Sequence, residues 1–121
     1  LVKRAWDIFN NDSFWLVAPH KLYDYGTIRS IENIDRKDAL RVTYTSGGTT
    51  PGDSYVWILD ENFVPKSYIM YLKNQIDRGN TKGFSATWDE WFRTESGALL
   101  TKKHTLSGGR KVRMGDVKAY N

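Results

Sequence analysis

The first twenty residues carry apolar side chains at helical spacing. The positions recur at i, i+3, i+4 and i+7: Val2, Ala5, Trp6 and Phe9. This spacing predicts a short amphipathic helix. We expect the polar run 10–13 to end that helix and a second short turn to form over 14–17. Pro19 ends the turn, because the residue before a proline avoids helical geometry. A helical segment is therefore predicted over 1–20.

From residue 27 onward the pattern has a period of two. Apolar and polar positions alternate in seven segments bounded by turn residues: 27–34, 39–45, 54–60, 64–73, 83–93, 98–106 and 111–120. Such alternation is typical of half-buried β-strands. Since the connections are short, we expect consecutive strands to run antiparallel. The chain is therefore predicted to be a single mainly β domain, with short helices followed by a curved antiparallel meander over 27–121.

Turn residues stand at four of these connections. The segment 50–53 (TPGD) fits a type II turn, with proline and glycine at the central positions. Residues 61–62 fit a two-residue hairpin in which Asn62 takes a positive φ. The segments 94–97 and 107–109 each end in a glycine, which suits a left-handed position in a tight reversal.

Three central strands are apolar on both faces. Alternate residues of each strand share a face: Tyr55, Trp57 and Leu59; Tyr68, Met70 and Leu72; Phe84, Ala86, Trp88 and Phe92. The other face is also apolar, with Val56, Ile58, Ile69, Tyr71 and Trp91. A sheet with one face in water would alternate cleanly. Helices, another sheet, a partner chain or an apolar ligand must therefore cover the second face.

Composition narrows the class of protein. The 121 residues are 40% apolar and 26% charged, which is typical of a globular domain. Aromatic residues make up 14%, which favours β structure or an aromatic-lined groove. No cysteine is present, which excludes disulfides, thiolate zinc sites and iron–sulfur clusters. The longest apolar runs, 14–18 and 55–59, have five residues and are too short for a transmembrane helix.

The net charge of +4 is concentrated in the last third of the chain. Within residues 98–121 there are six basic residues and one acid, Asp116; the basic residues are Lys102, Lys103, Arg110, Lys111, Arg113 and Lys118. A nucleic-acid or anionic membrane surface could use such a patch. A solvated sheet edge kept soluble by lysine and arginine is the favoured interpretation, and nucleic acid is not expected as a partner.

No catalytic constellation is evident. His20 and His104 are the only histidines, and no Ser lies in a G-x-S-x-G elbow. His104 is expected to have a partly exposed structural role within a strand. No metal-ligand spacing occurs, and no cofactor is expected. Asp53 is expected to cap the preceding loop by accepting backbone N–H bonds. The sequence therefore predicts a protein that is not an enzyme.

Two patterns carry a resemblance to a known family. They are Phe-Trp-Leu-x-x-Pro, within FNNDSFWLVAPHKLYDYGT at 9–27, and Pro-Gly-Asp-x-Tyr-x-Trp-x-Leu-Asp, within TSGGTTPGDSYVWILDENFVPKSYIM at 45–70. Together with ATWDEWFRTESGALLTKKH at 86–104, they resemble the C-terminal half of a domain from an uncharacterised family of secreted proteins of Gram-negative bacteria. That family is related in fold to the periplasmic lipoprotein carrier and the outer-membrane lipoprotein receptor (LolA/LolB-like). We interpret the chain as a processed or trimmed fragment, because it begins at Leu1 within a predicted helix and lacks a signal peptide.

The resemblance implies an unclosed half-barrel with helices on its concave side. It also implies a non-enzymatic, periplasmic or outer-membrane-associated domain that binds lipid or lipoprotein acyl chains there. The candidate lining residues are Tyr55, Trp57, Leu59, Tyr68, Met70, Phe84, Trp88 and Phe92. An alternative hypothesis is an interaction or assembly domain that forms a homodimer through exposed sheet edges or an apolar face. Peripheral contact with a membrane is compatible with either hypothesis.

Overall fold

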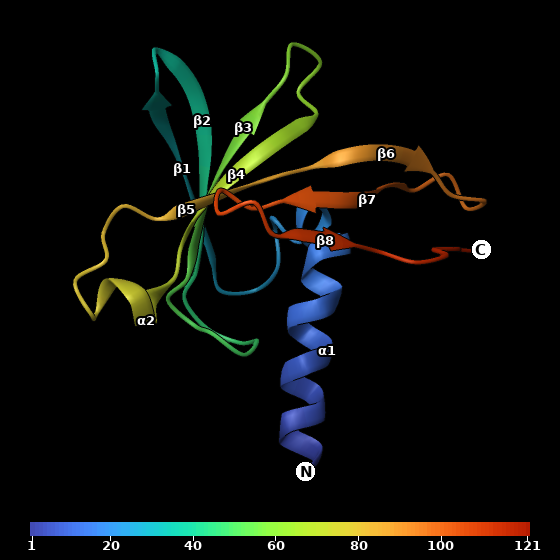
Figure 1. Ribbon diagram of the computed structural model, residues 1–121, viewed down its shortest axis with the longest axis horizontal. Helices are drawn as coiled ribbons and strands as arrows, with labels where there is room; N and C mark the ends of the chain where they lie inside the picture. Colours follow the sequence, from blue (N-terminus) through green and yellow to red (C-terminus); the bar gives the residue numbers. More distant parts are fainter.

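The computed structural model describes residues 1–121 and contains two antiparallel sheets and two α-helices (Figure 1). The elements follow in this order: α1 (Val2–Val17), the 3-10 helix η1 (Ala18–His20), β1 (Thr27–Ile34), β2 (Lys37–Tyr44), β3 (Ser54–Leu59), β4 (Pro65–Tyr71), α2 (Lys73–Ile76), β5 (Phe84–Thr87), β6 (Asp89–Arg93), β7 (Leu99–Thr105) and β8 (Lys111–Arg113). One sheet has the order β1-β2-β3-β4-β5 and the other β6-β7-β8. The predicted mainly β class is confirmed, and the sheets do not form a closed barrel.

The structure has eight strands where the sequence pattern predicts seven. The single strand predicted over 83–93 is wrong: it divides at Trp88 into β5, which pairs with β4, and β6, which pairs with β7. Glu90, with a φ of 56°, lies in the left-handed region and departs from extended geometry just after the division. The last predicted strand ends early, at Arg113, because Gly115 and Asp116 have low strand propensity.

The two sheets are joined through β5. Ala86 of β5 forms an isolated antiparallel bridge with Leu106, and the Ser107 N–H donates to the Ser85 carbonyl at 2.8 Å. The strands of the three-stranded sheet run across the direction of the five-stranded sheet (Figure 1). The chain therefore turns a corner at Trp88 and continues as a second, differently oriented sheet.

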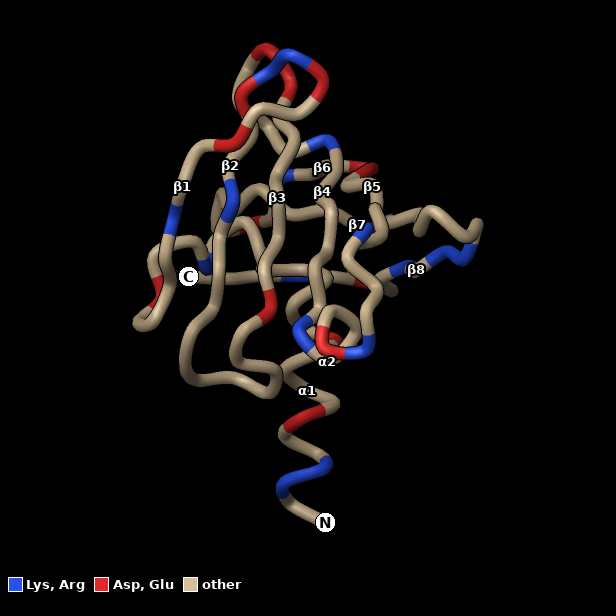
Figure 2. The backbone as a smooth tube through the Cα atoms, turned by 90° about the vertical axis from the view of Figure 1, so that its left-hand side faces the viewer, with Lys and Arg blue, Asp and Glu red and all other residues tan.

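Helix α1 is continuous from Val2 to Val17, so the predicted break over 10–13 is wrong. Polar residues in that run fit the helix: the Ser13 hydroxyl donates to the Asn10 carbonyl, and the Asn10 amide donates to Thr49 of a facing loop. The N-terminal half of α1 projects beyond both sheets (Figures 1 and 2). The predicted apolar stripe lies on this projecting part, where Trp6 and Phe9 are 59% and 60% exposed.

The core is an aromatic cluster on the face of the five-stranded sheet that is turned toward α1, called the inner face here. Trp57, Tyr68 and Trp88 are each at most 2% exposed. Their ring centroids lie 4.9 Å (Trp57–Tyr68), 5.1 Å (Trp57–Trp88) and 5.4 Å (Tyr68–Trp88) apart. Cross-strand pairing brings these rings together, because Trp57 is directly opposite Tyr68.

The outer face of the same sheet is also apolar, as the alternation predicts. Val56 is fully buried there, and Ile69, its partner on β4, is half-buried. The Arg41 guanidinium lies 4.7 Å from the centre of the Tyr71 ring and forms an ion pair with Glu32. Long side chains from neighbouring strands thus cover part of this face.

The turn predictions have mixed outcomes. Gly52 has a φ of 101° and the Asp53 N–H donates to the Thr50 carbonyl, which confirms the type II turn. The two-residue hairpin with a left-handed Asn62 is wrong. Instead Phe63 takes the positive φ, 61°, and the Asp60 carboxylate accepts the N–H groups of Asn62 and Val64. The carboxylate supports a longer turn than the two-residue pattern allows.

Candidate functional site

A large groove lies between α1 and the inner face of the five-stranded sheet. Its volume is about 980 Å³. Its floor consists of side chains from four adjacent strands and the residue after β4: Tyr44, Tyr55, Tyr68, Met70, Leu72 and Phe84. Helix α1 contributes one wall, with Trp6 and Phe9 toward its start and Phe14, Trp15 and Val17 toward its end, and the loop 46–50 contributes the rim. The walls and floor are mainly apolar, and the rim is polar.

Three tyrosines cross the floor on neighbouring strands. The Tyr44 and Tyr55 ring centroids are 5.9 Å apart in an edge-to-face arrangement, and Tyr55 and Tyr68 stack at 5.2 Å. Burial raises the pKa of all three phenols well above the ordinary value of 10. These side chains therefore stay neutral across the physiological pH range, and they offer rings and hydroxyl groups rather than charge.

The hydroxyl groups of these tyrosines differ in their partners. The Tyr44 hydroxyl donates to the Lys21 carbonyl at 3.3 Å. The hydroxyls of Tyr55 and Tyr68 make no hydrogen bond within the protein, yet neither is sealed from solvent. Two hydrogen-bonding groups are therefore free to contact a molecule in the groove.

Helix α1 packs on the floor through two consecutive aromatic residues. The Phe14 ring lies 5.7 Å from Tyr44 and 4.8 Å from Tyr55. The Trp15 ring lies 6.0 Å from Tyr68 and 5.0 Å from His104 of β7. These contacts position the helix across both sheets.

Polar contacts hold the rim in place. The Asn10 amide donates to the Thr49 hydroxyl at 3.2 Å, and that hydroxyl donates to the Asp7 carboxylate at 3.3 Å. Lys21 forms an ion pair with Asp24 at 2.5 Å. The loop after β2 is thus tied to α1.

Asp53 lies at the end of the floor, just before β3. It is 5% exposed, and its Oδ1 accepts the Lys73 N–H at 2.8 Å. The expectation that Asp53 caps its own preceding loop is wrong, because the N–H group that it accepts belongs to the start of α2, twenty residues further on. The contact instead joins the loop before β3 to the end of β4.

The eight predicted lining residues divide into three groups. Tyr55, Tyr68, Met70 and Phe84 line the groove. Trp57 and Trp88 lie beneath it in the sealed core, and Leu59 packs against that core. Phe92 lies on the other sheet, away from the groove.

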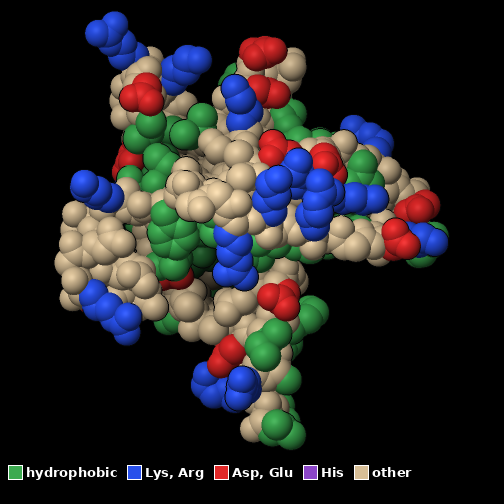
Figure 3. Space-filling model, in the orientation of Figure 1, with side chains coloured by type: hydrophobic (Ala, Val, Ile, Leu, Met, Phe, Trp, Pro, Cys, Tyr) green, Lys and Arg blue, Asp and Glu red, His purple; other side chains and the backbone are tan.

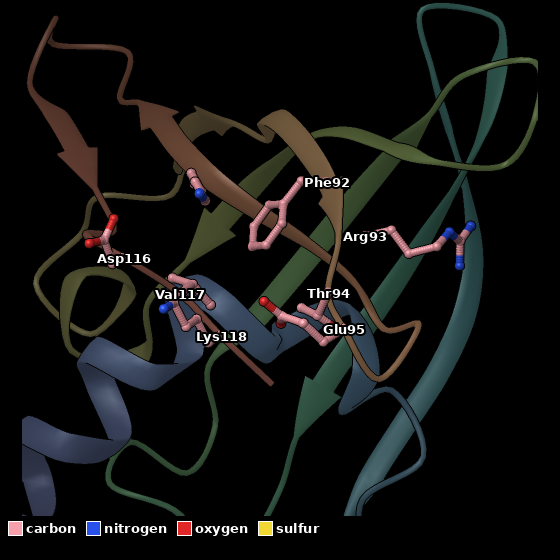
Figure 4. A pocket seen from close by; sticks show the side chains of 8 residues that line it. Phe92, Arg93, Thr94, Glu95, Asp116, Val117 and Lys118 are labelled. Carbon is pink, nitrogen blue, oxygen red and sulfur yellow. The ribbon is translucent and has the colours of Figure 1, made fainter. Parts of the chain in front are cut away.

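The alternation predicts the wrong location for Phe92, because the chain turns at Trp88 and enters the other sheet. Trp91, expected on the opposite face, packs on Trp88 with ring centroids 6.2 Å apart, and its Nε1–H donates to the Pro65 carbonyl. Phe92 instead lines a small polar hollow of about 250 Å³, with the Lys102 ammonium 4.4 Å from its ring centre. Figure 4 shows Phe92 facing Asp116 and Lys118 across this hollow, while Arg93 extends away from it.

The groove also contains residues that the strand pattern does not indicate. Phe14 and Trp15 come from the helix, and Tyr44 comes from β2, outside the three strands that are apolar on both faces. The available signal was the apolar run 14–18. Five consecutive apolar residues cover all sides of a helix, which indicates that this part of the helix packs against other elements.

The two histidines lie outside the groove. His104 is fully buried, which corrects the expectation of partial exposure, and its Nδ1 is 2.8 Å from the Thr87 carbonyl. The Nε2 of His20 is 2.8 Å from the Leu99 carbonyl and joins η1 to β7. No group of three or more His, Asp or Glu side chains is arranged to hold a metal ion.

Lysine and arginine side chains gather over the three-stranded sheet (Figure 3). Glu90 lies among them, 3.8 Å from Lys103 and 3.6 Å from Arg113. Neither helix combines the length and the hydropathy that crossing a bilayer would require. Comparison with protein-family models, with curated proteins and with solved structures finds no match to this chain.

Proposed function

We propose that this chain is a non-enzymatic binding domain that holds a lipid or lipoprotein acyl chain in the groove between α1 and the five-stranded sheet. The observation that carries the proposal is the groove itself, about 980 Å³ in volume and lined by Tyr55, Tyr68, Met70 and Phe84. Ligand sites typically have volumes of about 300–1,000 Å³ and mainly apolar walls with a few polar groups. The groove is at the upper end of that range.

The chemistry of the lining favours binding over catalysis. The phenols are neutral, and the Lys21 ammonium is paired with Asp24. His104 is separated from the groove by the Trp15 ring, on which it packs. No histidine in this chain reaches the groove, so an acid–base role there would fall to the lining aspartates alone.

The resemblance to the LolA/LolB-like carriers supports the same proposal. Those proteins are expected to hold acyl chains between a curved sheet and helices, and here a helix lies over the inner face of a sheet. An extracytoplasmic location, in the periplasm or at the outer membrane, belongs to this proposal and rests on the resemblance alone.

Binding of a neutral apolar fluorophore tests the proposal. N-phenylnaphthylamine should gain fluorescence with the wild-type protein, and dodecanol should displace it. Phe84→Glu places a charge in the apolar floor and should weaken binding by about tenfold or more. Phe63→Glu is the matched control, since Phe63 is 82% exposed in a turn and should tolerate the same change. Equal affinity in both variants, or no binding to the wild type, would overturn the proposal.

A second candidate function is self-assembly through the projecting half of α1. The observation that favours it is the exposed aromatic pair Trp6 and Phe9, whose rings stack at 5.7 Å, beside an 83% exposed Val2. A second copy of this chain could bury that surface. Sedimentation equilibrium should then show a dimer that Val2→Glu, a change outside the groove lining, converts to a monomer. A monomeric wild type at high concentration would exclude this candidate.

A further inference from the structure

The groove contains a buried negative charge at one end. Asp53 is 5% exposed and lines the groove. It shares the strand parity of Tyr55, which places both side chains on the inner face. Its Oδ1 accepts the Lys73 N–H at 2.8 Å. Its Oδ2 accepts no hydrogen bond from the protein and is not sealed from solvent.

No cation of the protein neutralises this carboxylate. Lys73, whose backbone N–H contacts Asp53, forms an ion pair through its ammonium group with Asp77, at 2.7 Å. Lys21 is paired with Asp24. The one lysine and two aspartates of the lining give the groove a net charge of −1. Buried carboxylates are normally paired or hydrogen-bonded at both oxygens, so an unpaired one in an apolar groove needs a partner.

The neighbouring phenol responds to this charge. Burial raises the pKa of Tyr55, and the negative charge of Asp53 raises it further. The same field acts on any molecule in the groove: it favours a positive group at this end and opposes a negative one.

We propose that the ligand of the groove is an amphiphile whose chain lies on the tyrosine floor and whose primary ammonium group binds the Asp53 carboxylate. This inference rests on the proposed function. It assigns the headgroup chemistry, and it implies that free fatty acids bind poorly, since their carboxylate would lie against Asp53. The ammonium group could belong to an aminophospholipid headgroup or to a free long-chain amine.

Three probes of equal chain length test the headgroup: dodecylammonium, dodecanol and dodecanoate, each competing with N-phenylnaphthylamine at neutral pH and below micelle formation. A charge-assisted hydrogen bond should favour dodecylammonium over dodecanol by about tenfold and leave dodecanoate the weakest. Lyso-phosphatidylethanolamine and lyso-phosphatidylglycerol of one chain length then distinguish the sources. A preference for the former assigns a lipid headgroup, and equal binding of the two assigns a free amine.

The Asp53→Asn variant removes the charge and keeps an oxygen for the Lys73 N–H. Its binding of dodecanol should be unchanged, and its preference for dodecylammonium should fall to about twofold or less. Asp38→Asn is the matched control, because Asp38 is exposed and lies outside the groove. If Asp53→Asn does not fold, the wild type still decides, since it must bind dodecylammonium more tightly than dodecanol and dodecanoate least tightly.

Distinct outcomes separate the two proposals. Binding of dodecanol without any preference for dodecylammonium, or with dodecanoate as the tightest probe, overturns the headgroup inference and leaves the proposed function standing. A preference that persists in Asp53→Asn also overturns it. Failure of all three probes to bind overturns the proposed function and the headgroup inference with it.

Discussion

The imidazole ring of His104 meets the indole ring of Trp88 edge to face, with centroids 4.4 Å apart and planes at 73°. The Trp15 ring packs on the same imidazole at 5.0 Å. The Nδ1 of His104 lies 2.8 Å from the Thr87 carbonyl. Because burial in this apolar cluster disfavours the charged form, the pKa of His104 is lowered from its ordinary value of 6.5.

Stability should therefore fall as the pH drops below the ordinary histidine pKa of about 6.5. In that window the unfolded chain binds a proton at His104 more readily than the folded chain does, so the free energy of unfolding rises with pH. Urea titrations between about pH 7.5 and about pH 5.5 measure this slope. His104→Phe keeps a ring beside Trp88 and should flatten it, whereas the exposed-site control His20→Gln should not. An unchanged slope in His104→Phe would contradict the assignment.

Trp88 and Phe92 should respond very differently to truncation, although alternation alone places them on one face. Trp88→Ala removes a 2% exposed core side chain and should cost about 3–5 kcal/mol of unfolding free energy. Phe92→Ala should cost about 1 kcal/mol, because Phe92 is half-buried at a polar hollow and its cation contact with Lys102 is weak. Chemical denaturation of the two variants measures the difference, and comparable costs would show that the corner at Trp88 is misplaced.

Phe63 should be replaceable by glycine with a gain in stability. Its φ of 61° is unfavourable for a residue with a Cβ atom by about 1–2 kcal/mol, and its side chain is 82% exposed. The greater freedom of glycine in the unfolded chain offsets about 0.5–1 kcal/mol of the relief. Phe63→Gly should therefore raise the free energy of unfolding by up to about 1 kcal/mol. Phe63→Ala, which keeps the Cβ atom, should give no such gain in the same denaturation assay.

The Asp60 carboxylate should matter more for the β3–β4 turn than any side chain within it. Its Oδ1 accepts the N–H groups of Asn62 and Val64, at 2.8 and 2.9 Å. Asp60→Ala leaves both donors without this partner and should cost about 1–2 kcal/mol. Asp60→Asn keeps an acceptor and should cost less than half of that. Thermal unfolding compares the variants, and equal losses would indicate that charge, rather than hydrogen bonding, supports the turn.

The strands could be predicted from sequence where pairing is local. The expected range 27–34 matches β1, because alternation and flanking turn residues mark both of its ends. The type II turn at Gly52 was likewise predictable from Pro and Gly at its centre. The corner at Trp88 was not, because it depends on a left-handed Glu90, which alternation does not reveal. Once parity is lost there, Phe92 and Trp91 exchange faces.

Half of the predicted lining residues do line the groove, and the reason for the other half is geometric. Parity places Tyr55 and Trp57 on one face correctly, but it does not tell which of them a helix leaves accessible. Which residue stays accessible depends on where Phe14 and Trp15 pack. Their contacts join residues about 30 to 90 positions apart in the sequence. Asp53 was visible in sequence as a turn residue, and only the structure shows that it is buried in the groove lining.

The adjacent pair Phe14 and Trp15 gives α1 a mechanical role. Phe14 packs on Tyr44 and Tyr55 of one sheet, whereas Trp15 also packs on His104 of the other. Moving α1 away from the groove floor would therefore also break its contact with the second sheet. The first half of α1 projects from this packed end, so a force on Trp6 or Phe9 would be transmitted to both sheets.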